Sequence, residues 1–215
     1  MQNLIEQEKF ELEVLDNLNS YKLLDKLIFT GGTMLRLCYG LDRYSIDLDF
    51  WIVRKTDLLK LFKLIKNCLL NYYTLKDSAD KHNTLLFEIK SANYPNRLKI
   101  EIRKAQKKVS VEKSIAYSKS TNRQVLLNTV SLNDMMEAKT DAFLERKEIR
   151  DAFDIEFLLK KGIILKADEK KKKRILETLK LLTPKDYKVK LGSIVEQEIR
   201  GYYISENFKI LKSYL

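Results

Sequence analysis

The sequence predicts an α+β fold in two parts, an α/β domain over residues 1–130 and a helical domain over residues 131–215. Convincing strand patterns, short apolar or alternating runs, occur only in the first part. In the second part the apolar residues recur at helical spacing instead. Ser131, with Asp134 three residues later, resembles a capping box, so we expect a helix to begin where the pattern changes.

Local patterns then predict each element in order. Strands are expected where apolar residues run together or alternate with polar ones: residues 27–30, 44–53, 84–90, 97–104 and 124–130. The turn at 93–96 predicts that the strands 84–90 and 97–104 form an antiparallel pair. Helices are expected where apolar residues recur at helical spacing: residues 3–27, 33–39, about 57–73, 132–147, 150–161, 168–182 and 192–213. Asn19-Ser20 would break the first of these, and Thr56 or Asp57 would cap the third.

Composition excludes several classes of site. The 215 residues are 45% hydrophobic and 33% charged, which is ordinary for a chain with a real core. Only Cys38, Cys68 and His82 are available as soft ligands or for a histidine-based triad, so a zinc cluster is excluded and a triad is disfavoured. No secretory signal and no membrane-spanning run is present, so a cytoplasmic protein without a membrane partner is expected.

A net charge of +11 favours an anionic partner such as nucleic acid or nucleotides. Residues 166–215 contain 13 Lys/Arg and seven Asp/Glu, and five basic residues follow Glu169 directly. This clustering predicts a polyanion-binding surface, with four tyrosines as candidates for stacking on bases: Tyr187, Tyr202, Tyr203 and Tyr214. Solvated lysine-rich helices with core tyrosines are the alternative.

The predicted strand 44–53 carries polar residues on one face. Side chains alternate along a strand, so Ser45, Asp47 and Asp49 would share a face above an apolar one. Two carboxylates about 7 Å apart repel each other, and a hard divalent ion such as Mg²⁺, or Mn²⁺, would relieve that repulsion. A solvated polar face is the alternative.

Two further features would complete a phosphate-transfer site. The turn Gly31-Gly32-Thr33 would let phosphate oxygens approach backbone N–H groups at a helix start, although it is not a Walker A loop. Glu101 would supply a third carboxylate if its strand lies beside that of Asp47. Three carboxylates holding two metal ions are typical of phosphoryl and nucleotidyl transfer. A solvent-facing glutamate is the alternative for Glu101.

The region after Ser131 mixes charges into an apolar stripe. Lys139, Arg146, Arg150 and Asp154 fall within about 80° of one another if the helix is continuous. Lys139 and Arg146 would suit a triphosphate, and Arg150 could pair with Asp154 or with a carboxylate of the active site. A salt-bridged helix surface is the alternative.

Together these pieces resemble the DNA polymerase β-like nucleotidyltransferase superfamily. The segment GGTMLRLCYGLDRYSIDLDF is similar to the first motif of the AbiEii/AbiGii toxin family, and AKTDAFLERKEIRDAFDIEFL to its second. The resemblance covers most of residues 25–160. It implies a mixed sheet flanked by helices, followed by a C-terminal helical bundle.

The resemblance also implies roles for individual residues. Asp47 and Asp49 would hold the metal, with Glu101 as the superfamily's third acid. Lys139 would contact the triphosphate, and Asp154 would be a further essential acid, with Asp151 as the competing candidate. The remaining nucleotide-binding residues implied are Gly31, Gly32, Thr33, Ser45, Arg43, Arg146 and Arg150, of which Arg43, like Arg36, is expected chiefly to brace the loop.

The family resemblance implies a toxin of a type IV toxin–antitoxin or abortive-infection system. Such an enzyme would transfer a nucleoside monophosphate from a nucleoside triphosphate to an RNA 3′ hydroxyl, with the tRNA acceptor end as the expected target. Its antitoxin would be encoded separately and need not bind it. Transfer to a protein hydroxyl or a small molecule, and a non-catalytic nucleic-acid-binding module, are the alternatives.

Overall fold

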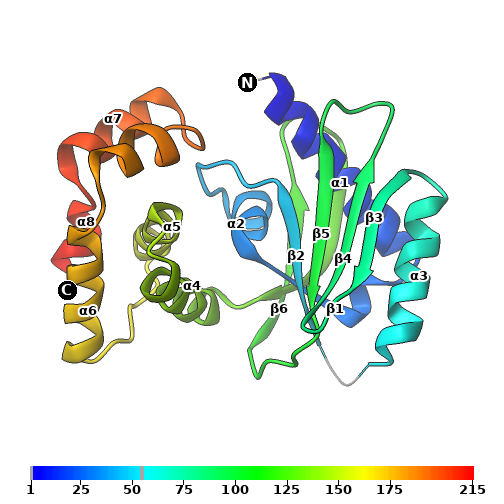
Figure 1. Ribbon diagram of the computed structural model, residues 1–215, viewed down its shortest axis with the longest axis horizontal. Helices are drawn as coiled ribbons and strands as arrows, with labels where there is room; N and C mark the ends of the chain where they lie inside the picture. Colours follow the sequence, from blue (N-terminus) through cyan, green and yellow to red (C-terminus); the bar gives the residue numbers. More distant parts are fainter. Residues whose placement is uncertain (1, 54–55) are drawn as a thin grey trace. The chain divides into compact units, whose positions relative to one another are not determined.

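The computed structural model describes residues 2–53 and 56–215 and divides the chain into two compact units (Figure 1). The first unit comprises Met1–Gly40 and Tyr44–Val130, and the second comprises Leu41–Arg43 and Ser131–Leu215. The short segment Leu41–Arg43 therefore belongs with the helical unit, although the chain on both sides of it belongs with the first unit.

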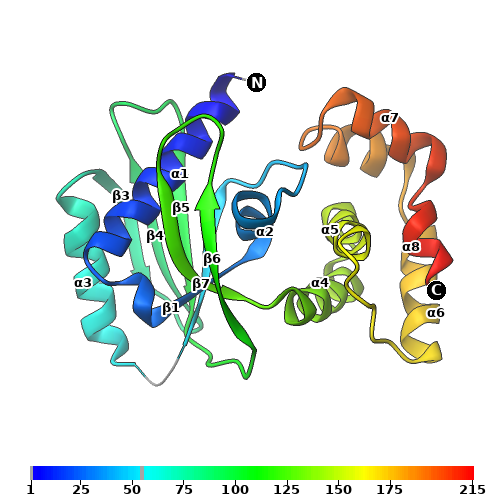
Figure 2. The ribbon, with the colours of Figure 1, turned by 180° about the vertical axis from the view of Figure 1, so that it is seen from behind.

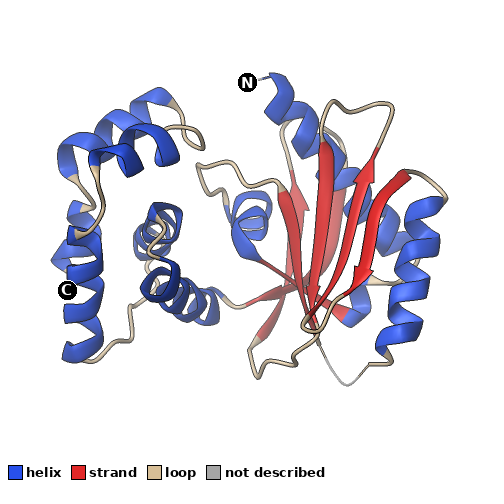
Figure 3. Ribbon diagram, viewed as in Figure 1, coloured by secondary structure: helices blue, strands red, loops and turns tan. Residues whose placement is uncertain are grey.

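The first unit is built on one seven-stranded mixed sheet (Figure 3). Its spatial order is β3-β4-β5-β2-β1-β7-β6, and the pairs β2–β5 and β1–β7 are parallel while the other four are antiparallel. The strands are β1 Leu27–Thr30, β2 Asp47–Ile52, β3 Thr74–Asp80, β4 Thr84–Lys90, β5 Arg97–Arg103, β6 Val111–Tyr117 and β7 Gln124–Val130.

The sheet has one apolar face, which helices α1 (Gln2–Ser20) and α3 (Leu58–Leu70) cover (Figure 2). Phe62 of α3 stacks on Phe87 of β4 with ring centroids 4.9 Å apart. Phe87 lies opposite Ile100 of β5, which lies opposite Leu48 of β2, so these three side chains share that face. The intervening residues of β2 and β5, including Asp47, Asp49 and Glu101, point to the other face.

Polar caps fix where two of the helices begin. The Asp57 carboxylate accepts a hydrogen bond from the Lys60 backbone N–H at 3.0 Å, which starts α3. The Ser131 hydroxyl accepts from the Asp134 N–H at 3.2 Å, which starts α4 (Leu132–Arg146). The cap expected at Ser131 is confirmed, and of the two residues expected to cap the earlier helix, Thr56 and Asp57, the cap is Asp57.

The second unit consists of helices around its own apolar core. Phe143, Ile155, Leu158 and Phe208 are fully buried there. The buried Glu156 carboxylate accepts a hydrogen bond from the Leu211 N–H at 2.9 Å and so connects α5 (Ile149–Lys160) to the last helix. The elements are α4 Leu132–Arg146, α5 Ile149–Lys160, α6 Glu169–Lys180, a π-helical turn η2 Asp186–Leu191, α7 Gln197–Glu206 and α8 Lys209–Ser213.

The predicted α+β class is confirmed, with a mixed sheet flanked by helices and a helical second part. Two strands were missed, β3 and β6, because both are sheet edges with mostly exposed residues and carry little apolar pattern. The single helix expected over 192–213 is wrong. Asn207 and Phe208 both adopt left-handed backbone angles, with φ of 48° and 55°, and separate α7 from α8.

Two shorter departures concern the remaining part of the first unit. The expected helical region 3–27 is α1 followed by a 3₁₀ helix, η1, at Leu24–Lys26, and the region after Gly31 is helix α2, Gly31–Tyr39. Strand β2 begins at Asp47, so Ser45 lies in the preceding loop and not on the strand. Among the helices of the described ranges, none combines the length and apolar character needed to cross a membrane.

Candidate active site

The glycine turn between β1 and α2 lies directly against Asp49. Gly31 has φ +82°, a conformation that side-chain-bearing residues rarely adopt. A Cβ atom placed on Gly31 would lie 2.5 Å from Oδ2 of Asp49. The position therefore requires glycine for two reasons, its backbone angle and the close approach of the carboxylate. Helix α2 begins here, and the backbone N–H groups of its first turn have no partner within the helix. These groups lie at the end of the helix that is next to the Asp49 carboxylate.

Asp47 and Asp49 project from the same face of β2. Both are half-buried, whereas Leu48 and Phe50, which alternate with them, are buried. In the parallel pairing with β5, Asp49 lies opposite Glu101 and Asp47 opposite Lys99. From the sequence, Glu101 was expected to join the two aspartates only if its strand lies beside that of Asp47. Strand β5 does lie beside β2.

Glu101 is already engaged by a cation. Lys99 forms an ion pair with the Glu101 carboxylate, two residues along the same strand. The hydrogen bond to Glu101 raises the pKa of Lys99 against the opposing effect of burial, and the charges of Asp47 and Asp49 raise it further. Lys99 thus remains a cation within the acidic face of the sheet.

The fit of a divalent ion can be judged from these donors. In the part of the chain that the structure describes, no three His, Cys, Asp or Glu side chains are gathered as a ready-made metal site. Asp47 and Asp49 nevertheless offer two carboxylates on one face, and Mg²⁺ is commonly held by one or two carboxylates together with water and substrate phosphates. The pair fits such an ion, and a metal-binding role for Glu101 stays a prediction.

Helices α1 and α2 hold the loop that leads into β2. The Thr33 hydroxyl donates to the Asp47 carbonyl at 2.7 Å, and Arg36 Nη2 donates to the Ser45 carbonyl at 3.2 Å. The Arg36 guanidinium is in turn held by ion pairs to Glu8 and Glu11 of α1. Two side chains of α2 therefore hold the main chain at Ser45 and Asp47, and α1 holds one of them.

Glu11 is completely buried in this arrangement, and its Oε1 atom has no hydrogen-bond partner. Burial raises the pKa of Glu11 to about 8, although the adjacent Arg36 guanidinium acts in the opposite direction. Burial thus favours the neutral form of the Glu11 carboxyl group, whereas the Arg36 guanidinium favours the charged form.

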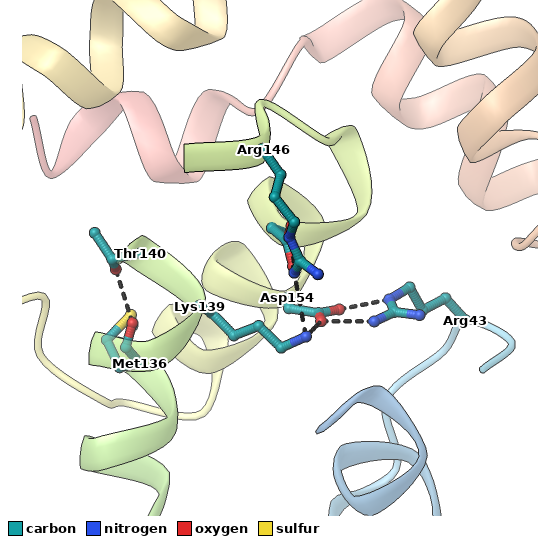
Figure 4. A network of polar contacts seen from close by, with 7 residues as sticks. Arg43, Met136, Lys139, Thr140, Arg146 and Asp154 are labelled. Carbon is teal, nitrogen blue, oxygen red and sulfur yellow. Dashed lines mark hydrogen bonds and ion pairs between the residues drawn. The ribbon is translucent and has the colours of Figure 1, made fainter. Parts of the chain in front are cut away.

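The second unit contains a cluster of five charged side chains, which we call the ionic cluster: Arg43, Lys139, Arg146, Asp151 and Asp154 (Figure 4). Asp154 lies between two cations. Arg43 donates to its two oxygens at 2.5 and 2.6 Å, and Lys139 Nζ lies 2.6 Å from Oδ2. Arg146 donates to both oxygens of Asp151 at 2.8 and 2.9 Å, and Lys139 Nζ lies 3.6 Å from Asp151 Oδ1.

The charges of the cluster are strongly coupled. Burial by itself would raise the pKa of Asp154, but the charges of Arg43 and Lys139 outweigh it and hold that pKa below its ordinary value. The guanidinium of Arg43 is buried as well, and Asp154 raises its pKa despite that burial. Three cations share two carboxylates, so the ionic cluster has one excess positive charge.

The continuous helix on which Lys139 and Asp154 were expected to share a stripe is not present in the structure. The helix is not continuous, since α4 ends at Arg146 and Lys147 turns the chain with φ +57°. Helical phase between Lys139 and the two aspartates therefore has no meaning, and both carboxylates lie near its ammonium group. Asp154 pairs with Arg43 and Lys139, not with Arg150, which is exposed on α5.

Several contributors were not singled out from the sequence. Lys99 carries no signal beyond its place in an alternating strand. Glu8 and Glu11 could have been noticed, because Glu11 falls within the apolar stripe of α1 beside Phe10 and Val14, where an acid needs a partner. Arg43 was named, but its buried pairing with Asp154, 111 residues away, is a tertiary contact that no local pattern reveals.

Comparison with known proteins identifies the family to which the chain belongs. Residues 13–188 match the family model described as "Nucleotidyl transferase AbiEii toxin, Type IV TA system". No protein with curated annotation matches the chain.

Two solved structures share the fold. One is JHP933 from Helicobacter pylori, with a TM-score of 0.62 and 21% identity over 99% of this chain and 93% of that one. The other, from H. pylori and described as a candidate nucleotidyltransferase, has a TM-score of 0.61 and 21% identity over 99% of this chain and 96% of that one. At this identity the likeness establishes the fold.

Proposed function

Because the chain belongs to the AbiEii family of nucleotidyl transferase toxins of type IV toxin–antitoxin systems, we propose that it transfers a nucleoside monophosphate from a nucleoside triphosphate to an RNA 3′ hydroxyl, at the acceptor end of tRNA. Such a modification would block translation or phage propagation. The observation that carries the proposal is the placement of Asp47 and Asp49 on one strand face, with Asp49 against the start of α2.

Asp47 and Asp49 would hold Mg²⁺ or Mn²⁺. Bound there, a divalent ion would lower the pKa of the attacking hydroxyl and offset the charge of the departing pyrophosphate. The chain itself supplies the placement of the two carboxylates. The hydrogen bonds from Thr33 and Arg36 to the main chain at Asp47 and Ser45 set the direction in which β2 begins.

The start of α2 offers phosphate oxygens a set of backbone donors. The first N–H groups of a helix have no partner within it, and the helix dipole favours an anion there. Gly31 and Gly32 bring no side chain of their own to this point, where the Asp49 carboxylate lies against Gly31, and Thr33 is held by its hydroxyl hydrogen bond. These groups would orient the reacting phosphate against the carboxylates.

The ionic cluster would contribute to triphosphate binding through its excess positive charge. Arg146 is the accessible member, with 43% of its side chain exposed, whereas Lys139 and Arg43 are buried. A phosphate would therefore contact the Arg146 guanidinium, and the buried Lys139 ammonium group would add to the positive potential. Lys139 can serve two purposes, since it also neutralises Asp154.

The acceptor would be held by basic residues around α6. Lys166, Lys170, Lys171 and Arg174 line an open groove of about 740 Å³, together with the acids Asp141, Glu145 and Asp168. Lys171 pairs with Asp141 at 2.8 Å, so part of the basic charge is neutralised locally. The remaining cations suit a phosphodiester backbone, whose binding would weaken as salt concentration rises.

The experiment that tests the proposal uses the purified protein with Mg²⁺, each of the four labelled ribonucleoside triphosphates in turn and total cellular RNA. Wild type should label a tRNA-sized band on a denaturing gel, and Asp47→Ala, folded to the same extent, should not. Full activity of Asp47→Ala would rule out the assigned role. Label in protein or in a small molecule would replace the RNA acceptor, and RNA binding without any nucleotide turnover would indicate a non-catalytic module.

A further inference from the structure

The second unit contains an aromatic pocket that the proposed function does not use. It has a volume of about 230 Å³ and is lined by Phe153, Phe157, Ile199, Tyr202 and Tyr203, with Asp42 and Lys160 as its charged members. Tyr203 is buried, while Tyr202 is 37% exposed at the entrance. The pocket therefore opens to solvent and is not a void within the core.

The polar side of the pocket is formed by Lys160. Its ammonium group lies 5.3 Å from the ring centroids of both Tyr202 and Tyr203 and donates to the Tyr203 hydroxyl at 3.2 Å. Beneath it, Glu156 Oε1 lies 3.5 Å away. A flat ring entering the pocket would thus meet aromatic surfaces, one cationic donor and, at Asp42, one anionic acceptor.

The dimensions and chemistry restrict what can bind. Sites for complete drug-sized molecules measure about 300–1,000 Å³, so 230 Å³ accommodates only a part of a larger ligand. A nucleobase has the required shape, because it is a planar ring that stacks on aromatic side chains and carries donors and acceptors at its edge. A purely aliphatic group would make no use of the charged groups of Lys160 and Asp42.

The pocket also adjoins the ionic cluster. Asp42 directly precedes Arg43, and Phe153 directly precedes Asp154, while Arg43 and Asp154 are joined by two hydrogen bonds. A nucleoside triphosphate carries a base and a string of negative charges on one sugar. An aromatic pocket next to a cluster with excess positive charge matches both ends of such a molecule.

We propose that the aromatic pocket binds the base of the nucleoside triphosphate while the ionic cluster attracts its phosphates. This inference rests on the proposed function, because it assumes that a nucleoside triphosphate is the donor substrate. It assigns Tyr202 and Phe157 as stacking residues and Lys160 as a donor to the base edge.

Equilibrium binding to the full chain with Mg²⁺ tests the proposal. Calorimetry compares ATP, GTP, CTP and UTP with inorganic tripolyphosphate, which has the charge but no base. Tyr202→Ala should weaken binding of the preferred nucleotide about five- to 150-fold, the range expected for loss of one stacking contact, and leave tripolyphosphate binding unchanged. Tyr202→Phe, which keeps the ring, should bind as wild type does.

Tyr214→Ala is the matched control, since Tyr214 is similarly exposed in the second unit but does not line the pocket. Phe157→Ala provides an independent variant if Tyr202→Ala unfolds. Nucleotide binding that is unchanged in both pocket variants would overturn the proposal, and a loss of RNA binding alone would assign the pocket to the acceptor instead. Wild-type protein that binds neither nucleotides nor tripolyphosphate would contradict the proposed function itself.

Discussion

Replacing Gly31 with alanine should displace the Asp49 carboxylate and also lower the unfolding free energy. A control variant separates these two effects. The Cβ atom would lie 2.5 Å from Asp49 Oδ2, whereas real Cβ contacts essentially never fall below 3.0 Å. The carboxylate must therefore move by at least the difference, or the turn must open. The first change displaces one of the two proposed metal-binding groups, and the second separates that group from the start of α2.

The expected magnitudes separate two effects. An alanine at φ +82° costs about 1–2 kcal/mol of stability from its backbone conformation alone. Misplacement of a catalytic group by about 1 Å can reduce turnover about 100-fold. Gly162→Ala is the matched control, because Gly162 has φ +81° and a Cβ atom there would meet nothing within 4 Å.

Urea unfolding and a nucleotidyl transfer assay should be applied to both variants. We expect similar losses of unfolding free energy, but a loss of transfer activity and of Mg²⁺ affinity only in Gly31→Ala. Equal activity in the two variants would mean that the contact between Gly31 and Asp49 does not position the carboxylate.

Two other predictions concern buried charges. Asp154→Asn should lower the unfolding free energy by about 3–5 kcal/mol, because the buried Arg43 guanidinium then loses the carboxylate that it pairs with. Arg97→Gln, which removes a surface ion pair with Glu88, should lower it by less than about 1 kcal/mol. Equal losses of the two variants in urea unfolding would contradict this. For Glu11, the carboxyl ionises near 4.5 when unfolded and near 8 when folded, so its contribution to stability is greatest below pH 4.5 and declines up to pH 8. Thermal melts at stepped pH should show wild type losing stability relative to Glu11→Gln across this interval, and a constant difference would exclude a buried, neutral carboxyl.

The sequence was informative where a pattern is local. The alternation in residues 84–90 and 97–104 predicted two strands and their antiparallel pairing, because side-chain period and turn residues are encoded within a few positions. The caps at Asp57 and Ser131 were predicted for the same reason. Edge strands β3 and β6 were missed, since they bury few side chains and need little apolar pattern.

The arrangement of the candidate site was less accessible. The carboxylates of Asp47 and Asp49 could be placed on one face from period two alone, and the position of Glu101 could be stated only as a condition on strand order. The register that sets Asp49 opposite Glu101 depends on a parallel pairing across 52 residues of chain, which no local signal specifies. In the same way, the break at Lys147 determines which aspartates meet Lys139, and a left-handed lysine has no sequence signature.

The proposed function requires that the chain transfers a nucleotide and not a phosphate. The most direct measurement incubates wild type and Asp47→Ala with RNA, Mg²⁺ and the preferred nucleoside triphosphate, labelled in parallel at the α- or the γ-phosphate. We predict that wild type incorporates the α-label into RNA and releases the γ-label as pyrophosphate, and that Asp47→Ala does neither. Incorporation of the γ-label, or undiminished incorporation by Asp47→Ala, would contradict the account.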